Sequence, residues 1–190
     1  MNYKALYRRS LLLLSQPQKA WSTIMMESPR LSVERCFVFP LMGLCGTAVL
    51  IGHLLHYGFA NGGWWNSMME ACVTCVALLG CFYLSAWASN GFLVRYLKSD
   101  DDVARSRILV GYSMVVTFVL VIFTGLFPSL AIFRYVLQFY VLYVVWLGVK
   151  EVYGIGEDKR MTVTLVISAL ILLVPFFIHL IFDKLSTTVV

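Results

Sequence analysis

The stretch ACVTCVALLGCFYLSAWASNGFLV, residues 71–94, contains no Lys, Arg, Asp or Glu. A helix rises about 1.5 Å per residue, so about 20 apolar residues cross the hydrocarbon core of a bilayer. Four further segments have similar length and apolar character, and we expect spans at about 37–57, 71–94, 108–127, 130–149 and 161–182. The sequence therefore predicts an all-α integral membrane bundle of five transmembrane helices.

The composition of the whole chain supports a membrane protein. Hydrophobic residues make up 60% of it and charged residues 13%, and a soluble domain needs more charge to cover its surface. The net charge of +5 comes from short Lys/Arg clusters between uncharged runs. Such clusters suit anionic lipid headgroups, so we expect membrane lipid and not nucleic acid as a partner. Cys72 and Cys75 have C-x-x-C spacing, but they lie in an apolar span and are interpreted as packing residues.

Lys and Arg are distributed unevenly between the two sides of the predicted bundle. The segments 1–36, 95–107 and 150–160 carry six, four and three of them, whereas the opposite side carries Lys184 alone. Positive loops stay in the cytoplasm. The sequence thus predicts a cytoplasmic N-terminus and a C-terminus on the far side of the membrane.

Residues 1–35 form a cytoplasmic N-terminal segment ahead of one five-span domain, 36–184. Apolar residues recur there at helical spacing beside basic ones, and Pro17 suits the first position of a helix. We expect two short amphipathic helices on the cytoplasmic leaflet with Trp21 at headgroup level. The alternative is a helix packed under the bundle.

Turn and small residues predict how the spans connect and pack. Gly125 and Pro128 predict a tight hairpin between the third and fourth spans, and Asp100 to Asp102 can cap the third span. Small residues such as Gly43, Gly46 and Gly52 permit close approach of helices, either within the bundle or in self-association.

Ionisable side chains gather at the predicted outer ends of the spans. We expect a binding cluster there, formed by His53, His56, Glu70, Arg134, His179 and Asp183. Such groups near a membrane interior are usually paired or functional. Three interpretations stay open: a divalent metal, with His53, His56 and His179 as candidate ligands; a charge-paired cluster that fixes the bundle; and plain interfacial helix ends.

The sequence indicates no enzyme. It contains none of the short motifs of zinc proteases, serine hydrolases or P-loop nucleotide-binding proteins. We therefore expect no catalytic residue and no cofactor, apart from the divalent metal just considered.

Three stretches resemble the Yip domain family, multi-span membrane proteins named for interaction with Ypt/Rab GTPases. They are Ser15-Gln-Pro-Gln-Lys-Ala-Trp-Ser-Thr-Ile24, Gly111-Tyr-Ser113 before the Gly-Leu-Phe-Pro turn, and Tyr143-Val-Val-Trp-Leu-Gly-Val-Lys150 followed by Asp158-Lys-Arg160. The resemblance covers most of residues 15–182. It implies five spans with the N-terminus inside, in agreement with the charge count.

At two points the sequence departs from the family pattern, and these points indicate which members it resembles. Val115 and Val116 stand where a proline often follows the Tyr-Ser of the third span, and the long acidic cytoplasmic region of eukaryotic members is absent. The resemblance therefore indicates a bacterial member in the inner membrane and carries no expectation of GTPase binding.

The favoured function is a non-enzymatic scaffold that organises membrane proteins or lipid and can self-associate. One alternative is a small transporter or channel with a polar outer mouth. The other is a metal-binding membrane protein or enzyme.

Overall fold

The structure is a computed structural model that describes residues 3–27, 32–58, 63–98 and 102–188. Within the last range it does not describe the side chains of residues 131, 179, 182, 183 and 185–188. The described residues form helices and no strands, which confirms the all-α prediction. In chain order they are α1 (Tyr3–Ser15), α2 (Pro17–Glu27), the π-helical turn η2 (Glu34–Val38), α3 (Phe39–Tyr57), α4 (Gly63–Leu97), α5 (Val103–Ser113), α6 (Val115–Leu126), the 3₁₀ turn η3 (Pro128–Leu130), α7 (Ala131–Gln138), α8 (Tyr140–Tyr153) and α9 (Glu157–Thr188).

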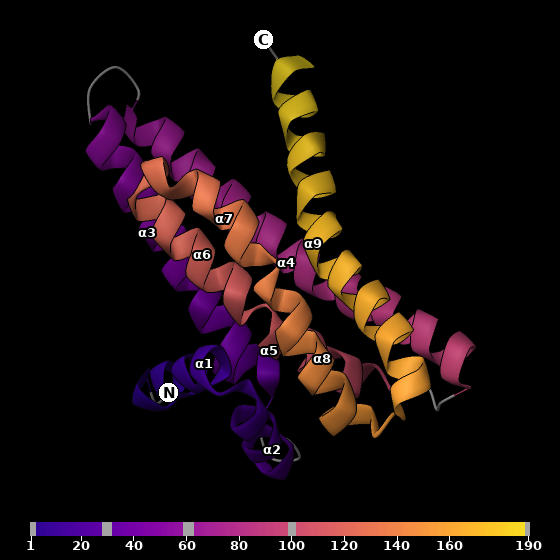
Figure 1. Cartoon of the computed structure of the whole chain (residues 1–190). Coiled ribbons are helices and arrows are strands. Elements are labelled where there is room, and N and C mark those ends of the chain that lie inside the picture. The colour runs from indigo at the N-terminus through magenta and orange to yellow at the C-terminus, as the bar shows by residue number, and fades with distance from the viewer. Residues whose placement is uncertain (1–2, 28–31, 59–62, 99–101, 189–190) are drawn as a thin grey trace.

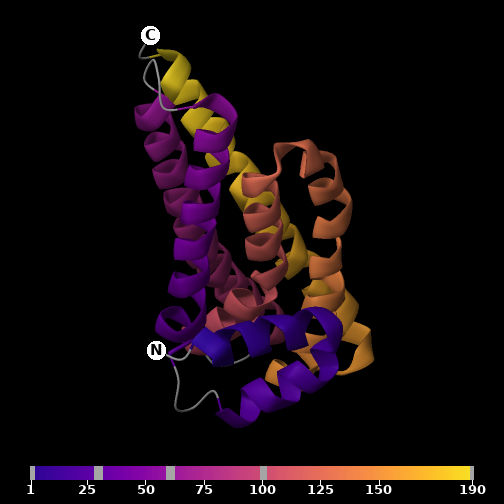
Figure 2. The same cartoon turned by 90° about the vertical axis from the view of Figure 1, so that its left-hand side faces the viewer.

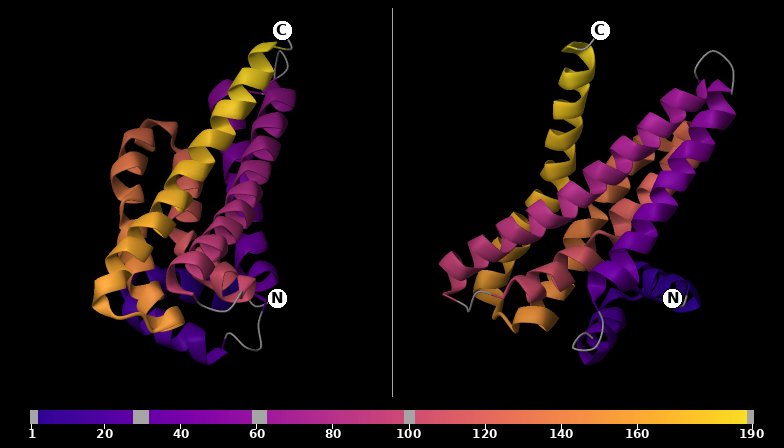
Figure 3. Two further views of the ribbon diagram at one scale, coloured as in Figure 1. Left: turned by 90° about the vertical axis from the view of Figure 1, so that its right-hand side faces the viewer. Right: turned by 180° about the vertical axis from the view of Figure 1, so that it is seen from behind.

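Five helical segments of the described chain are long and apolar enough to cross a membrane. They are Glu34–Tyr57, Gly63–Leu97, Val103–Leu126, Ile132–Tyr153 and Glu157–Ile178. The spans run alternately up and down (Figure 1). The end of α3, the start of α4, the α6–α7 turn and the end of α9 lie at one end of the bundle, which we call the distal end. The platform, our name for α1 and α2, lies at the opposite, proximal end with the end of α4, the start of α5 and the α8–α9 turn (Figure 3).

The helices end where the local sequence supplies turn and capping groups. The carboxylate of Asp102 accepts a hydrogen bond from the backbone N–H of Arg105 at 3.2 Å, which confirms this N-cap. Asp100 and Asp101 lie outside the described residues. Gly154 ends α8 in the left-handed conformation with φ of 61°, which glycine adopts without steric cost. Pro128 opens the short η3 turn between α6 and α7, so these two helices form the expected hairpin.

The second span extends further than its apolar stretch indicated. Helix α4 begins at Gly63, in a segment expected to be a loop. The hydroxyl of Ser67 donates to the Gly63 carbonyl at 2.6 Å in this first turn. As a result, Glu70 lies about two turns inside α4 instead of at its start.

Glycines set the distance between α3 and its neighbours. A Cβ on Gly52 would lie 1.7 Å from the carbonyl oxygen of Gly125, so α3 and α6 touch through their backbones. A Cβ on Gly46 would meet the Cys75 sulfur of α4 at 2.6 Å. Gly43, in contrast, has no atom within 4 Å of such a Cβ. Two of the three glycines named from the sequence therefore serve packing within the bundle.

The platform lies crosswise beneath the spans (Figure 2). Helix α2 is packed against α8, and the Trp21 side chain is 0% exposed. Its indole N–H donates to the carbonyl of Val144 at 3.0 Å. The Trp21 indole therefore does not face the lipid headgroups, because it finds its partner inside the protein. For α2 the structure agrees with the alternative of a helix packed under the bundle.

The fifth span leaves the bundle at its distal half. Pro175 lies inside α9, and a proline in a helix interior removes one backbone hydrogen bond and bends the helix. The C-terminal part of α9 diverges from α3 and α4 in Figure 1 and in the rear view of Figure 3. This divergence leaves the distal end less closely packed than the middle of the bundle.

Candidate functional site

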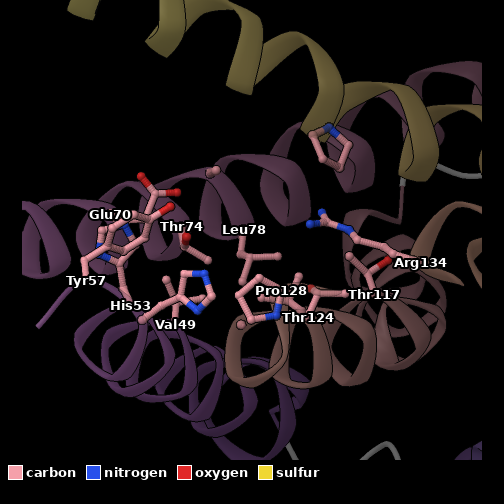
Figure 4. Close-up of a pocket in the computed structure, with 15 residues that line it drawn as sticks. Val49, His53, Tyr57, Glu70, Thr74, Leu78, Thr117, Thr124, Pro128 and Arg134 are labelled. Carbon is pink, nitrogen blue, oxygen red and sulfur yellow. The ribbon is translucent and has the colours of Figure 1, made fainter. Parts of the chain in front are cut away.

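A cavity of about 300 Å³ with polar and apolar lining lies at the distal end, between α3, α4, the α6–α7 hairpin and α9 (Figure 4). We call it the distal cavity. Its lining comprises Val49, His53, His56, Tyr57, Glu70, Thr74, Ala77, Leu78, Thr117, Val121, Thr124, Gly125, Pro128, Arg134 and Pro175. Four of the six residues expected to form a cluster thus line one space: His53, His56, Glu70 and Arg134.

His53 links α3 to the first turn of α4. Its Nδ1 lies 2.9 Å from the hydroxyl oxygen of Ser67, and that hydroxyl already donates to Gly63. Since a serine hydroxyl has one hydrogen, the His53 Nδ1 carries the proton and donates to Ser67. The His53 ring also packs against Tyr57 with 4.4 Å between ring centroids. His53 therefore joins two spans.

Arg134 projects into the distal cavity from the first turn of α7. Figure 4 shows its guanidinium directed toward the middle of the cavity, while Glu70 and Tyr57 lie at the other end. Arg134 forms no hydrogen bond or ion pair with any described side chain. Arg134 and Glu70 therefore line the same cavity without forming a salt bridge.

Threonine hydroxyls line the cavity beside the ionisable groups, and sequence reasoning did not assign them to the site. Thr124 donates to the Leu120 carbonyl one turn back at 2.8 Å. Thr117 is 1% exposed, and its hydroxyl has no hydrogen-bond partner in the described structure. A signal for both was present in the sequence, because positions 117, 121, 124, 125 and 128 share one face of a helix.

The remaining two predicted residues cannot be placed in the cavity. His179 and Asp183 follow Pro175 on α9, and their side chains lie outside the described part of the structure. Within the described ranges, no group of three or more His, Cys, Asp or Glu side chains is arranged to hold a metal ion. The expectation of a metal with His53, His56 and His179 as ligands stays untested.

The five cysteines are free. Cys72 is exposed on α4, whereas the thiol of Cys75 lies 3.8 Å from the Met42 carbonyl oxygen of α3. This placement fits the interpretation of Cys75 as a packing residue.

The three stretches that carry the family resemblance meet at the proximal end. The rings of Trp21 and Tyr112 pack edge to face with centroids 6.1 Å apart. A Cβ on Gly148 would lie 2.6 Å from the Trp21 ring. Arg160 lies over the Trp146 ring at 4.1 Å, and its Nε–H donates to the Trp146 carbonyl. Residues far apart in the sequence thus form one packing centre.

Comparison with known proteins identifies the family. Residues 11–178 match the Yip1 domain, which is nearly the whole chain. No curated protein and no solved structure matches the sequence. The matched region contains all three stretches of the packing centre and most of the five apolar spans. The chain is an integral membrane protein that belongs to the Yip1 domain family.

Proposed function

We propose that this protein is a non-enzymatic organiser of membrane lipid and membrane proteins, and that the platform is its contact surface. We also propose that it resides in a bacterial inner membrane with its N-terminus in the cytoplasm and its C-terminus outside. The observation that carries the proposal is a platform fixed to the bundle on one face and exposed, basic and apolar on the other.

Hydrogen bonds attach the inner face of the platform to the spans. The indole of Trp21 donates to Val144 on α8, and the hydroxyl of Tyr140 donates to the Leu14 carbonyl of α1 at 2.9 Å. Arg9 donates to the hydroxyl of Tyr112 at 3.4 Å. These contacts join α1 and α2 to two spans, through α8 and α5, so the platform holds a fixed orientation.

The outer face of α1 has the composition of an interfacial helix. Lys4 and Arg8 are exposed, and so is Tyr7 at 69%. Tyr7 and Leu11 also line an apolar groove of about 500 Å³ against α3 and α6. Basic groups that meet phosphates beside apolar groups that meet acyl chains characterise helices at a bilayer surface. The interfacial prediction therefore suits α1 better than α2.

Site-specific photo-crosslinking in living cells tests the platform. A photoreactive amino acid replaces Tyr7 or Met26, which is 83% exposed on α2. The control position is Ile132 on α7, which is 77% exposed at the distal end. We expect discrete protein adducts and lipid adducts from the platform positions, and lipid adducts alone from Ile132.

A charge-reversal variant makes this test specific. Lys4→Glu, Arg8→Glu and Lys19→Glu together remove the exposed positive charge of the platform. A basic residue near an anionic membrane surface contributes about 1 kcal/mol, so adduct yield should fall at least about tenfold. An unchanged yield, or no protein adduct from Tyr7 and Met26 in the unaltered chain, would contradict the organiser function.

Reporter fusions test the orientation separately. Alkaline phosphatase fused after Val190 should be active, because it folds outside the cytoplasm, and a green fluorescent protein there should stay dark. The reverse pattern would place the C-terminus in the cytoplasm and overturn the topology.

A transporter is the second candidate function, and the distal cavity together with buried hydroxyls favours it. Ser85, Ser89 and Thr117 are buried inside the bundle, and the hydroxyls of Ser89 and Thr117 lack hydrogen-bond partners among the described residues. Flux of protons, anions and divalent cations in proteoliposomes measures this activity. His53→Ala should change such a flux, and a chain that conducts none of these ions is not a transporter of them.

A further inference from the structure

The Arg134 cation lines the distal cavity without an ion-pair partner, and Glu70 lies at the other end of the same cavity. The Arg134 guanidinium has five N–H donors, and it finds no acceptor in the described structure. A charged side chain within a span is costly unless an opposite charge or water compensates it. Because the guanidinium points into the cavity and not away from the bundle (Figure 4), the compensating group belongs inside the cavity.

A second donor lies next to the same cavity, with its hydroxyl oxygen buried. Helical threonines usually donate to the carbonyl one turn back, as Thr124 does. Thr117 lines the cavity with its buried hydroxyl unpartnered. An unpaired buried hydroxyl costs about 1–3 kcal/mol, and a bound acceptor would remove that cost. Guanidinium and hydroxyl donors together suit the oxygens of a phosphate.

Clefts lined by aromatic and aliphatic side chains on both sides of Arg134 indicate what carries this phosphate. One cleft of about 560 Å³ lies between α7–α8 and α9, and Arg134 lines it with Phe139 and Phe176. Another of about 400 Å³ lies between α6 and α7, and Arg134 lines it with Phe133 and Leu137. The aromatic side chains of both clefts are largely exposed. Arg134 thus stands where the distal cavity meets an apolar cleft beside α6 and a mixed cleft beside α9 that Tyr135 and Gln138 also line.

We propose that the distal cavity binds the phosphate of an anionic phospholipid, with Arg134 as its cation and Thr117 as a second donor. The acyl chains lie against the two clefts beside α7. A water-soluble phosphate would fill the distal cavity alone and would leave the aromatic and aliphatic side chains of both clefts uncovered. Pro175 lines the cavity and the α9 cleft alike, so the bend in α9 opens the lateral entry for the lipid.

Photolabelling of the full-length protein in neutral detergent tests the site. The probe is phosphatidylglycerol with a photoreactive group in one acyl chain, and peptide mass spectrometry maps its adducts. We expect labelling of segments 130–139 and 172–178. Excess unlabelled phosphatidylglycerol should suppress it, whereas glycerol 3-phosphate and diacylglycerol should not. Suppression by glycerol 3-phosphate would indicate a free-phosphate site, and suppression by diacylglycerol an acyl-chain site; either result overturns the proposal.

Substitutions identify the donors. Arg134→Gln removes a charge-assisted hydrogen bond to the phosphate, so labelling of these segments should fall about tenfold or more. Arg134→Lys keeps the positive charge and should retain part of the labelling. Labelling of the platform serves as the internal control and should not change. Equal labelling of a folded Arg134→Gln variant would overturn the proposal.

The two cavity threonines give a matched pair that does not depend on Arg134. Thr117→Val should weaken labelling about fivefold, because a neutral hydrogen bond is lost. Thr124→Val should leave labelling unchanged, because that hydroxyl is used within α6. Without lipid, Thr117→Val should match or exceed the thermal stability of the unaltered chain. Equal effects of the two valine variants on labelling would remove Thr117 from the site.

Discussion

Replacing Trp21 with Phe measures how far the platform belongs to the folded bundle. The Trp21 side chain is fully buried, and its indole N–H bonds the Val144 carbonyl. The ring fills a socket formed with Gly148 and Tyr112. A tryptophan at the lipid headgroups would tolerate the same substitution, since water and phosphates would replace its partners.

The expected cost of Trp21→Phe is about 2 kcal/mol. Loss of the hydrogen bond contributes about 1 kcal/mol, and the void left by the smaller ring contributes on the order of 1 kcal/mol. Trp21→Ala should cost about 3–5 kcal/mol, because the whole buried side chain is removed. Trp87→Phe is the matched control, since Trp87 is 72% exposed on α4 and should lose less than about 0.5 kcal/mol.

Reversible unfolding by SDS in mixed micelles, followed by far-UV circular dichroism, gives the free energies of the three variants. If Trp21→Phe costs no more than Trp87→Phe, then α2 is not packed on the bundle as described. The same reasoning predicts that deletion of residues 1–30 unfolds the spans, so surface substitutions are the sound way to test the function of the platform.

Two further predictions concern the contacts of α3, measured by the same unfolding assay. Gly52→Ala should destabilise the bundle by about 1–3 kcal/mol, because its Cβ meets the backbone oxygen of Gly125. The control Gly43→Ala places its Cβ in open space and should be neutral or stabilising by up to about 1 kcal/mol. Equal effects of the two variants would rule out the close α3–α6 contact. His53→Ala should lower the free energy of unfolding by about 1 kcal/mol, because the hydrogen bond to Ser67 is lost. His53→Asn keeps a donor at this position and should restore part of that stability. An Asn variant no more stable than the Ala variant would contradict the assigned hydrogen bond.

Much of the fold follows from local properties of the sequence. The five spans follow from runs of apolar residues of bilayer length, and the cap at Asp102 and the turn at Pro128 follow from the chemistry of single residues. The start of α4 was not predicted, because Gly63 and the polar residues near it are typical of loops. In the structure, hydrogen bonds join Ser67 to Gly63 and to His53 in this first helical turn.

The candidate site was predictable in its members and not in its arrangement. Shared depth in the membrane was enough to group His53, His56, Glu70 and Arg134, which line one cavity. Depth says nothing of the rotation of each helix about its axis. It therefore could not show that Arg134 faces inward without an ion pair, or that Thr117 lies beside the same space with a free hydroxyl.

The sequence by itself determined that this chain is a five-span membrane protein of the Yip1 domain family, because hydrophobic length and short motifs are properties of contiguous residues. Tertiary structure alone decided where its polar and aromatic side chains find partners. Trp21 and Val144 are 123 positions apart, and their contact depends on how α2 docks against α8. Such contacts arise from the packing of whole helices, which no single stretch of the sequence encodes.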